Sequence, residues 1–165
     1  MPFTKQDWID RIKTRMDITG MVTHLTKPSK DLDLTDMDFN EINLKAVDNL
    51  IQILKDKRIN GSTTKTGFIT GSTPAVCFQD APLSGLIQNI LHEQERRKKN
   101  PKEKLRYCGV GLSFLKPFIY KKDGRPVIYD ESSTAKSYLT SSDHWRIVRF
   151  NLSNSSNYID WTHEY

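Results

Sequence analysis

Apolar side chains recur at helical spacing between residues 83 and 91, and this pattern constrains the fold more than any other part of the chain. Pro82 stands at the first turn, where a residue without an N–H group is tolerated. Residues 82–99 are therefore predicted to form a helix with one side against a core. The side chains that share that side are Leu83, Leu86, Ile87, Ile90 and Leu91.

Two earlier segments show a similar periodicity. Residues 4–16 begin with Thr4, followed three residues later by the acid Asp7, which is typical of a helix N-terminus. Residues 44–58 end in a cation-rich turn, where the helix dipole favours positive charge. We predict a helix in each segment and mostly loop in the acidic stretch 30–43 between them. The apolar stripe of the second helix consists of Leu44, Val47, Leu50, Ile51 and Leu54.

Strand-like alternation is concentrated in the second half of the sequence. Asp123 and Gly124 separate two β-prone runs, and an Asp-Gly pair in that setting is the strongest short-range signal of a β-hairpin. Helices early in the chain and antiparallel strands late indicate the α+β class. Strands are expected at residues 21–26, 66–70, 75–79, 107–115 and 144–153.

The length of 165 residues favours a single domain over residues 1–165, with an N-terminal helix at 4–16 and a core from about residue 19 to the end. Apolar residues make up 36% of the chain and charged residues 27%, which is typical of a globular protein and not of a disordered one. The apolar runs are too short to span a membrane, and the charged N-terminus differs from a signal peptide. We therefore expect a cytoplasmic protein with no membrane partner.

Most of the excess positive charge lies between residues 95 and 106, where seven Lys or Arg face two Glu, and the chain as a whole carries a net charge of +5. Such a run attracts polyanions, so it is a candidate nucleic-acid contact. The alternative interpretation is a solvated helix end followed by a loop. The residues proposed to contact nucleic acid are Arg96, Arg97, Lys98 and Lys99.

The sequence predicts no metal site. Cys77 and Cys108 lie in separate segments without the ligand spacing of a zinc site, so we expect buried or idle thiols. Asp130, Glu131 and Lys136 follow a predicted strand and loosely match the acids and lysine of a metal-dependent nuclease. The spacing is loose, and an exposed loop is the simpler explanation of this group.

His24 is the histidine best placed to bind a ligand. Thr26 follows it by two residues on a predicted strand, so both side chains are expected on the same face. Two hydrogen-bonding groups on one face of a strand suit the hydroxyls of a ligand. His92 instead fits the polar side of the predicted basic helix.

Six short segments, taken in order, resemble a known family. The chain is similar to the AbiGi family of phage-resistance proteins and, more distantly, to the DarT group of ADP-ribosyltransferases. The resemblance covers most of the chain from about His24 onward. It implies an ADP-ribosyltransferase-like core, a split antiparallel sheet with flanking helices that grips NAD in a central cleft. The segments are THLTK, NLIQILKDKRINGS, AVCFQDAPLSGL, YCGVGLSFLK, GRPVIY and DWTHEY.

The resemblance also implies roles for single residues. His24, with Thr26 beside it, would hydrogen-bond the nicotinamide-side ribose of NAD, and Phe78 would pack near the nicotinamide. Glu164 would be the catalytic carboxylate. Cleavage of NAD expels neutral nicotinamide while positive charge builds on the ribose, and a fixed carboxylate stabilises that charge. NAD would thus be a substrate, and the acceptor would be nucleic acid, protein or water.

The sequence departs from the family at two places. The family usually continues past this glutamate with a second acid and the pair WR, whereas this chain ends at Tyr165. Either the last strand is missing or the protein is short and has lost activity. Asp80 stands where the DarT group has an arginine.

Three functions therefore remain open. The first is an NAD-dependent ADP-ribosyltransferase or NAD glycohydrolase that serves phage defence by abortive infection. The second is a non-catalytic binding protein on the same fold, such as the antitoxin-like partner in a toxin–antitoxin pair. The third is a basic nucleic-acid-binding module or nuclease.

Overall fold

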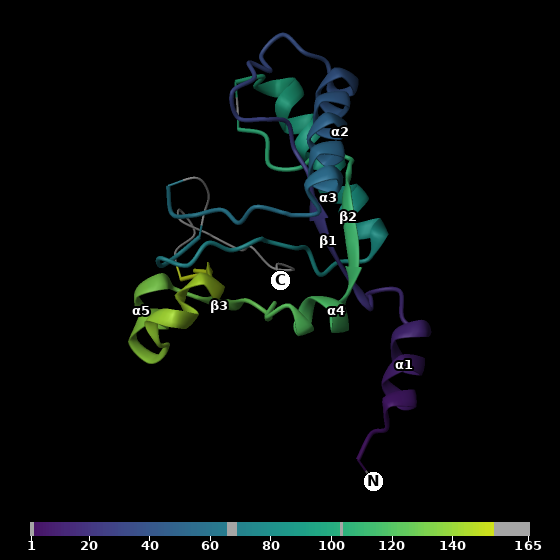
Figure 1. Cartoon of the computed structure of the whole chain (residues 1–165), viewed down its shortest axis with the longest axis vertical. Helices are drawn as coiled ribbons and strands as arrows, with labels where there is room; N and C mark the ends of the chain where they lie inside the picture. Colours follow the sequence, from purple (N-terminus) through teal and green to yellow (C-terminus); the bar gives the residue numbers. More distant parts are fainter. Residues whose placement is uncertain (1, 66–68, 103, 154–165) are drawn as a thin grey trace. The chain divides into compact units, whose positions relative to one another are not determined.

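The computed structural model describes residues 2–65, 69–102 and 104–153 (Figure 1). It confirms the α+β class, since helices are combined with two small two-stranded sheets. The elements are α1 (Lys5–Lys13), β1 (Met21–Leu25), α2 (Phe39–Asp56), α3 (Leu83–Lys99), β2 (Gly111–Leu115), α4 (Lys116–Lys121), β3 (Ile128–Asp130), α5 (Ser132–Tyr138), the 3-10 helix η1 (Ser141–Arg146) and β4 (Ile147–Arg149).

The chain divides into two compact units. The first consists of Met1–Arg58 and Gln79–Lys116, and the second of Ile59–Phe78 and Pro117–Tyr165. The expectation of a single domain stays a prediction. Within the described residues, every helix is too short or too polar to cross a lipid bilayer.

Helix α1 begins where the sequence predicts. The Thr4 side chain accepts a hydrogen bond from the Asp7 backbone, and the Asp7 carboxylate accepts one from the Thr4 N–H, which forms a capping box. These bonds with Thr4 hold the pKa of Asp7 below its ordinary value. The helix ends at Lys13, three residues before the predicted end, and none of its residues is buried.

Strands β1 and β2 form the antiparallel sheet of the first unit and lie side by side in Figure 1. Thr23 is paired with Ser113 on one side. On its other side Thr23 is paired with Gln79 through two backbone hydrogen bonds of 3.0 and 2.8 Å. A side chain at Gly111 would overlap the backbone carbonyl of His24, so this close pairing requires glycine. The order across this array is therefore β2, β1 and then the short segment at Gln79.

Helix α2 begins earlier than predicted. Asp38 and Glu41 form a second capping box. The helix therefore starts within the acidic stretch that was predicted to be mostly loop. The extra turn contains Ile42, which packs with Ala46 against the loop that precedes β2. The predicted stripe is only partly covered: Val47 and Leu50 are partly buried, whereas Leu44, Ile51 and Leu54 are exposed on the side opposite Ile42.

Helix α3 confirms the clearest prediction, with Pro82 as the residue before the first turn. Its buried positions are Leu86 and Glu93. The predicted apolar face is thus only partly covered, because Leu83, Ile87 and Leu91 are exposed.

The hairpin predicted around Asp123 and Gly124 is wrong. The run before this pair forms helix α4, and the pair ends that helix. Asp123 has a positive φ of 64°, and the Gly124 N–H donates to the Ile119 carbonyl across 3.0 Å. The Asp123 N–H donates to the Tyr120 carbonyl across 3.2 Å, which completes a Schellman motif. Asp and Gly tolerate a positive φ, and such a φ is needed at helix ends as well as in hairpins.

The late strands are also shorter than predicted, and their pairing is parallel. Strands β3 and β4 pair in parallel, joined by α5 and η1. Residues 144–146, predicted as strand, belong to η1. In segment 75–79 only isolated bridges form, one of them between Ala75 and Ser62. Residues 66–68 of another predicted strand lie outside the described residues, and residues 69 and 70 are not in a strand.

Candidate functional site

His24 lies in the strand that the sequence predicts, and Thr26 directly follows the end of that strand. His24 lies in β1 opposite Leu112 and is partly buried. Thr26 directly follows the strand, and its N–H donates to the Val110 carbonyl across 2.8 Å. Backbone pairing therefore fixes the positions of both residues on one element.

The Thr26 hydroxyl is buried without a partner. The residue is 2% exposed, and its Oγ1 makes no hydrogen bond with the described part of the chain. A buried hydroxyl without a hydrogen bond costs about 1–3 kcal/mol. Such a group retains its capacity to donate to and accept from a ligand.

The other two residues of the predicted NAD site are placed differently. Phe78 is buried and belongs to the second compact unit. Glu164 lies outside the described residues. The grouping of His24, Phe78 and Glu164 around one cleft therefore stays a prediction.

A polar row that sequence reasoning missed crosses the β1 array. The Thr23 and Ser113 hydroxyls are 2.8 Å apart, and Gln79 is paired opposite Thr23 on the other side. Gln79 is 5% exposed, and its Oε1 has no partner within the described residues. No sequence pattern indicates this row, because the pairing of Gln79 with β1 joins distant segments through a single bridge.

Asp80 follows this row and does not stand alone. Its carboxylate lies 2.7 Å from the Lys116 ammonium group. The acid at this position, where the DarT group has a cation, is therefore locally neutralised. Lys116 lies at the junction of β2 and α4, so the ion pair also ties the end of β2 to the segment at Gln79.

The predicted nucleic-acid contact forms the last turn of α3, and several of its cations are already engaged. Arg97 donates to the Leu34 carbonyl. Lys98 lies 2.6 Å from Glu95, and this hydrogen bond lowers the pKa of that glutamate. Lys98 and Lys99 are exposed, whereas Arg96 and Arg97 are partly buried. The four cations are thus two pairs with different surroundings.

Arg96 and Arg97 line a shallow hollow that opens to solvent. Lys104 and Leu105 line it from the segment that follows α3. Its fifth lining residue, Glu93, is 6% exposed. The Glu93 carboxylate accepts a hydrogen bond of 2.9 Å from the Arg106 N–H and lies 3.8 Å from the Arg96 guanidinium.

The residues that matched a nuclease act as hydrogen-bond acceptors. Asp130 accepts from the Tyr138 hydroxyl across 2.8 Å. Glu131 accepts from Asn151 and Arg149 across 3.1 and 3.4 Å. The bond from Asn151 is the main cause that lowers the pKa of Glu131. These contacts tie the ends of β3 and β4 together and connect β3 to α5.

Lys136 is exposed on α5. No group of three or more His, Cys, Asp or Glu side chains that could hold a metal ion occurs within the described residues. The nuclease interpretation therefore gains no support from this part of the chain.

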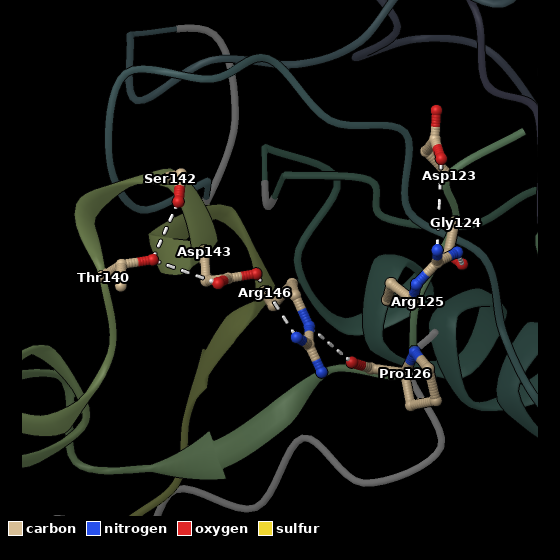
Figure 2. A network of polar contacts seen from close by, with 8 residues as sticks. All are labelled: Asp123, Gly124, Arg125, Pro126, Thr140, Ser142, Asp143 and Arg146. Carbon is tan, nitrogen blue, oxygen red and sulfur yellow. Dashed lines mark hydrogen bonds and ion pairs between the residues drawn. The ribbon is translucent and has the colours of Figure 1, made fainter.

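Arginines also organise the second unit (Figure 2). Arg146 donates to the Pro126 carbonyl across 3.1 Å and lies 3.3 Å from Asp143. Arg125 donates to the Tyr120 carbonyl across 2.9 Å, and its guanidinium lies 4.0 Å from the centre of the Tyr120 ring. Both arginines therefore bind backbone carbonyls and hold turns in place.

Comparison with known protein families, curated proteins and solved structures gives no match for this chain.

Proposed function

We propose that this chain is an NAD-binding protein with an ADP-ribosyltransferase-like split sheet that acts in bacterial phage defence. The observation that carries this proposal is the buried Thr26 hydroxyl, which has no hydrogen-bond partner within the described residues and lies next to the strand that holds His24. The antiparallel pairing of β1 and β2 also suits the proposed sheet. A ribose hydroxyl would satisfy the Thr26 oxygen, for which residues 2–65, 69–102 and 104–153 provide no partner.

In the proposed reaction, the bond between the ribose carbon and the nicotinamide nitrogen breaks. Nicotinamide leaves as a neutral molecule with the electron pair of that bond, and the ribose becomes positively charged. The Glu164 carboxylate would stabilise this charge, while His24 and Thr26 hold the ribose and Phe78 packs against the nicotinamide. An acceptor hydroxyl or amine then bonds to the ribose carbon and loses its proton, which the Glu164 carboxylate would take; water in the same role gives NAD hydrolysis.

The sharpest test is Thr26→Val, which removes the hydroxyl and keeps the side-chain shape. Without NAD, the variant should be as stable as the wild type or more stable, because an unsatisfied polar group is lost. The thermal shift that NAD produces should fall in the variant, because a bond to the ribose is lost. An unchanged NAD shift would contradict the assignment of Thr26.

Catalysis is tested by nicotinamide release from NAD. His24→Ala and Glu164→Gln should abolish release, and His92→Ala should leave it unchanged. NAD binding without turnover in the wild type would favour the non-catalytic, antitoxin-like alternative. The absence of both binding and turnover would overturn the NAD proposal.

Nucleic-acid binding at the end of α3 is the second candidate function. Four consecutive cations, Arg96 to Lys99, form the last turn of this helix. More cations follow at Lys102, Lys104 and Arg106. Binding to an oligonucleotide should weaken steeply as salt rises, because released counterions drive such association. Salt-independent binding, or no binding at low salt, would exclude this function.

A further inference from the structure

We propose that two copies of this chain associate through an exposed apolar face of α2, with the two helices antiparallel. This face, the α2 seam, consists of Leu44, Val47, Ile51 and Leu54. Leu44, Ile51 and Leu54 are 65%, 43% and 55% exposed, and Val47 is partly buried. A contiguous row of exposed aliphatic side chains is typical of a surface that binds a partner.

Contacts on the other side of α2 keep the seam exposed. Ile42 and Ala46 are 0% exposed and belong to the core of the first unit. The Asn49 side chain, about two turns after Ile42, donates to the Lys27 carbonyl across 2.8 Å. Rotation of α2 to cover the seam within its own unit would therefore break these contacts.

The spacing of the seam selects another helix as its occupant. Its members lie three, four and three residues apart. This is the alternation of a and d positions in a coiled coil, with Leu44 and Ile51 at a and the other two residues at d. Such a stripe is narrower than the apolar face of a helix on a globular core, and it packs against a second helix at a small crossing angle.

The charges along α2 are complementary to themselves, which selects a second copy of this chain. The helix starts with the acids Asp38 and Glu41, whereas its end carries three cations and one acid. Antiparallel pairing places the acidic start of each helix beside the basic end of the other and opposes the two helix dipoles. Parallel pairing would bring like charges together. The charged residues at the end are Lys55, Asp56, Lys57 and Arg58.

One register brings all four seam positions of both copies together. Leu44 then lies beside Leu54 of the second copy, and Val47 lies beside Ile51 of the second copy. Each contact occurs twice, because the pair has a two-fold axis. In the same register Glu41 flanks the seam opposite Lys55 of the second copy, as charges do in coiled coils.

The size of the seam limits the strength of the pairing. Four apolar side chains from each copy form a contact at the small end of specific interfaces, where association is weak and transient. We therefore expect mostly dimer at a concentration of about 100 μM and monomer below about 1 μM.

The first measurement is analytical ultracentrifugation of the full chain over this range of concentration. The mass of the wild type should rise from that of a monomer toward that of a dimer. Leu44→Glu should weaken association at least about tenfold, because each dimer then places two carboxylates in apolar layers. A wild type that stays monomeric at 100 μM would overturn the proposal.

Leu83→Glu is the matched control. It makes the same chemical change at a position of α3 that is 72% exposed and lies outside the seam. Far-UV circular dichroism should be the same for both variants and the wild type, since both positions are exposed. Leu83→Glu should change association less than about twofold. Equal losses in the two variants would indicate general apolar attraction and would overturn the seam.

The orientation is tested by cross-linking in a Cys77→Ser background, which removes the exposed thiol and leaves the buried Cys108. A mixture of Leu44→Cys and Leu54→Cys chains should be joined by a short bis-maleimide, and either chain alone should not. Cross-linking of each chain alone, without preference for the mixture, would indicate parallel helices and overturn the antiparallel pairing.

The register is tested at Asp48, which flanks the seam at the two-fold axis and meets the same residue of the second copy. Asp48 lies 4.0 Å from Lys45 of its own helix, which reduces the repulsion between the two acids only in part. Asp48→Asn should therefore tighten association by about twofold to fivefold. Weaker association of this variant would overturn the register.

Discussion

Ile42, Ala46, Leu105 and Cys108 pack together in the first compact unit, whereas arginines hold the turns of the second unit by binding backbone carbonyls. Apolar packing resists any loss of volume, because interiors are close to crystalline density. Contacts between a guanidinium group and a carbonyl near the surface each contribute less, because water competes for both partners. The two units should therefore differ in how they respond to mutation and to chemical probes.

The two thiols should show the largest difference, since Cys108 lies in the core of the first unit and Cys77 is exposed in the second. Burial raises the pKa of Cys108 from 9.0 to about 12. The fraction of reactive thiolate at pH 8 is then about a thousandfold lower than for a thiol with the ordinary value. A thiol reagent should show one fast and one very slow reaction, and Cys77→Ser should remove the fast one. Two equally fast thiols would show that the core is open.

Truncation of a core side chain should have the second-largest effect. Ile42 is 0% exposed, so Ile42→Ala should lower the free energy of unfolding by about 2–5 kcal/mol in a urea titration. Leu44, two residues along the same helix, is 65% exposed, so Leu44→Ala should change stability by only about 0.5 kcal/mol or less. The reverse ranking would mean that the predicted stripe, and not the Ile42 side, faces the core.

A smaller loss of folding stability is expected from a mutation in the second unit. Arg146→Gln removes the bond to the Pro126 carbonyl and the contact with Asp143. We expect a loss of about 1 kcal/mol, because one charge-assisted bond at a partly exposed site is affected. Hydrogen exchange should rise at amides of residues 126–149 and stay unchanged around Ile42. A uniform rise throughout the chain would instead indicate that the two units unfold together.

The smallest expected effect is a change of folding stability with pH. The Asn151 amide is the main cause that holds the pKa of Glu131 below its ordinary value of 4.5. A carboxyl with a lowered pKa in the folded state stabilises the protein above that ordinary value and loses this contribution as the pH falls through the lowered value. The stability difference between wild type and Glu131→Gln should therefore be constant near neutral pH and decrease in acid. A difference that grows in acid would contradict the contacts of Glu131.

Local signals in the sequence predicted the helices well and their orientation poorly. Thr4 and Asp7 cap α1 as expected, because capping depends on residues three positions apart. The apolar stripe that starts at Leu44 correctly predicts a helix. It does not identify the side that meets the core, because that side is set by partners at Leu105 and Cys108, far along the chain.

Tertiary pairing was the least predictable part. An Asp-Gly pair allows a positive φ in a hairpin and at a helix end alike, so the pair alone does not show which of the two forms. The pairing of Gln79 with Thr23 joins segments with no shared pattern. Of the candidate site, the strand position of His24 was predicted. The hollow beside Glu93 was not, because a buried glutamate is exceptional and its partner is a backbone N–H.

The two sheets also differ in when they can form during synthesis. Strand β4 begins 17 residues after β3 ends, so this pairing needs only a short piece of chain. Thr23 and Ser113 are separated by 90 positions, and the closing of so long a loop slows folding. While the ribosome makes the chain between them, β1 lacks its strand partner β2, and the edge that β2 later covers is open to other nascent chains. The edge of β1 is therefore where we expect chaperones to be needed.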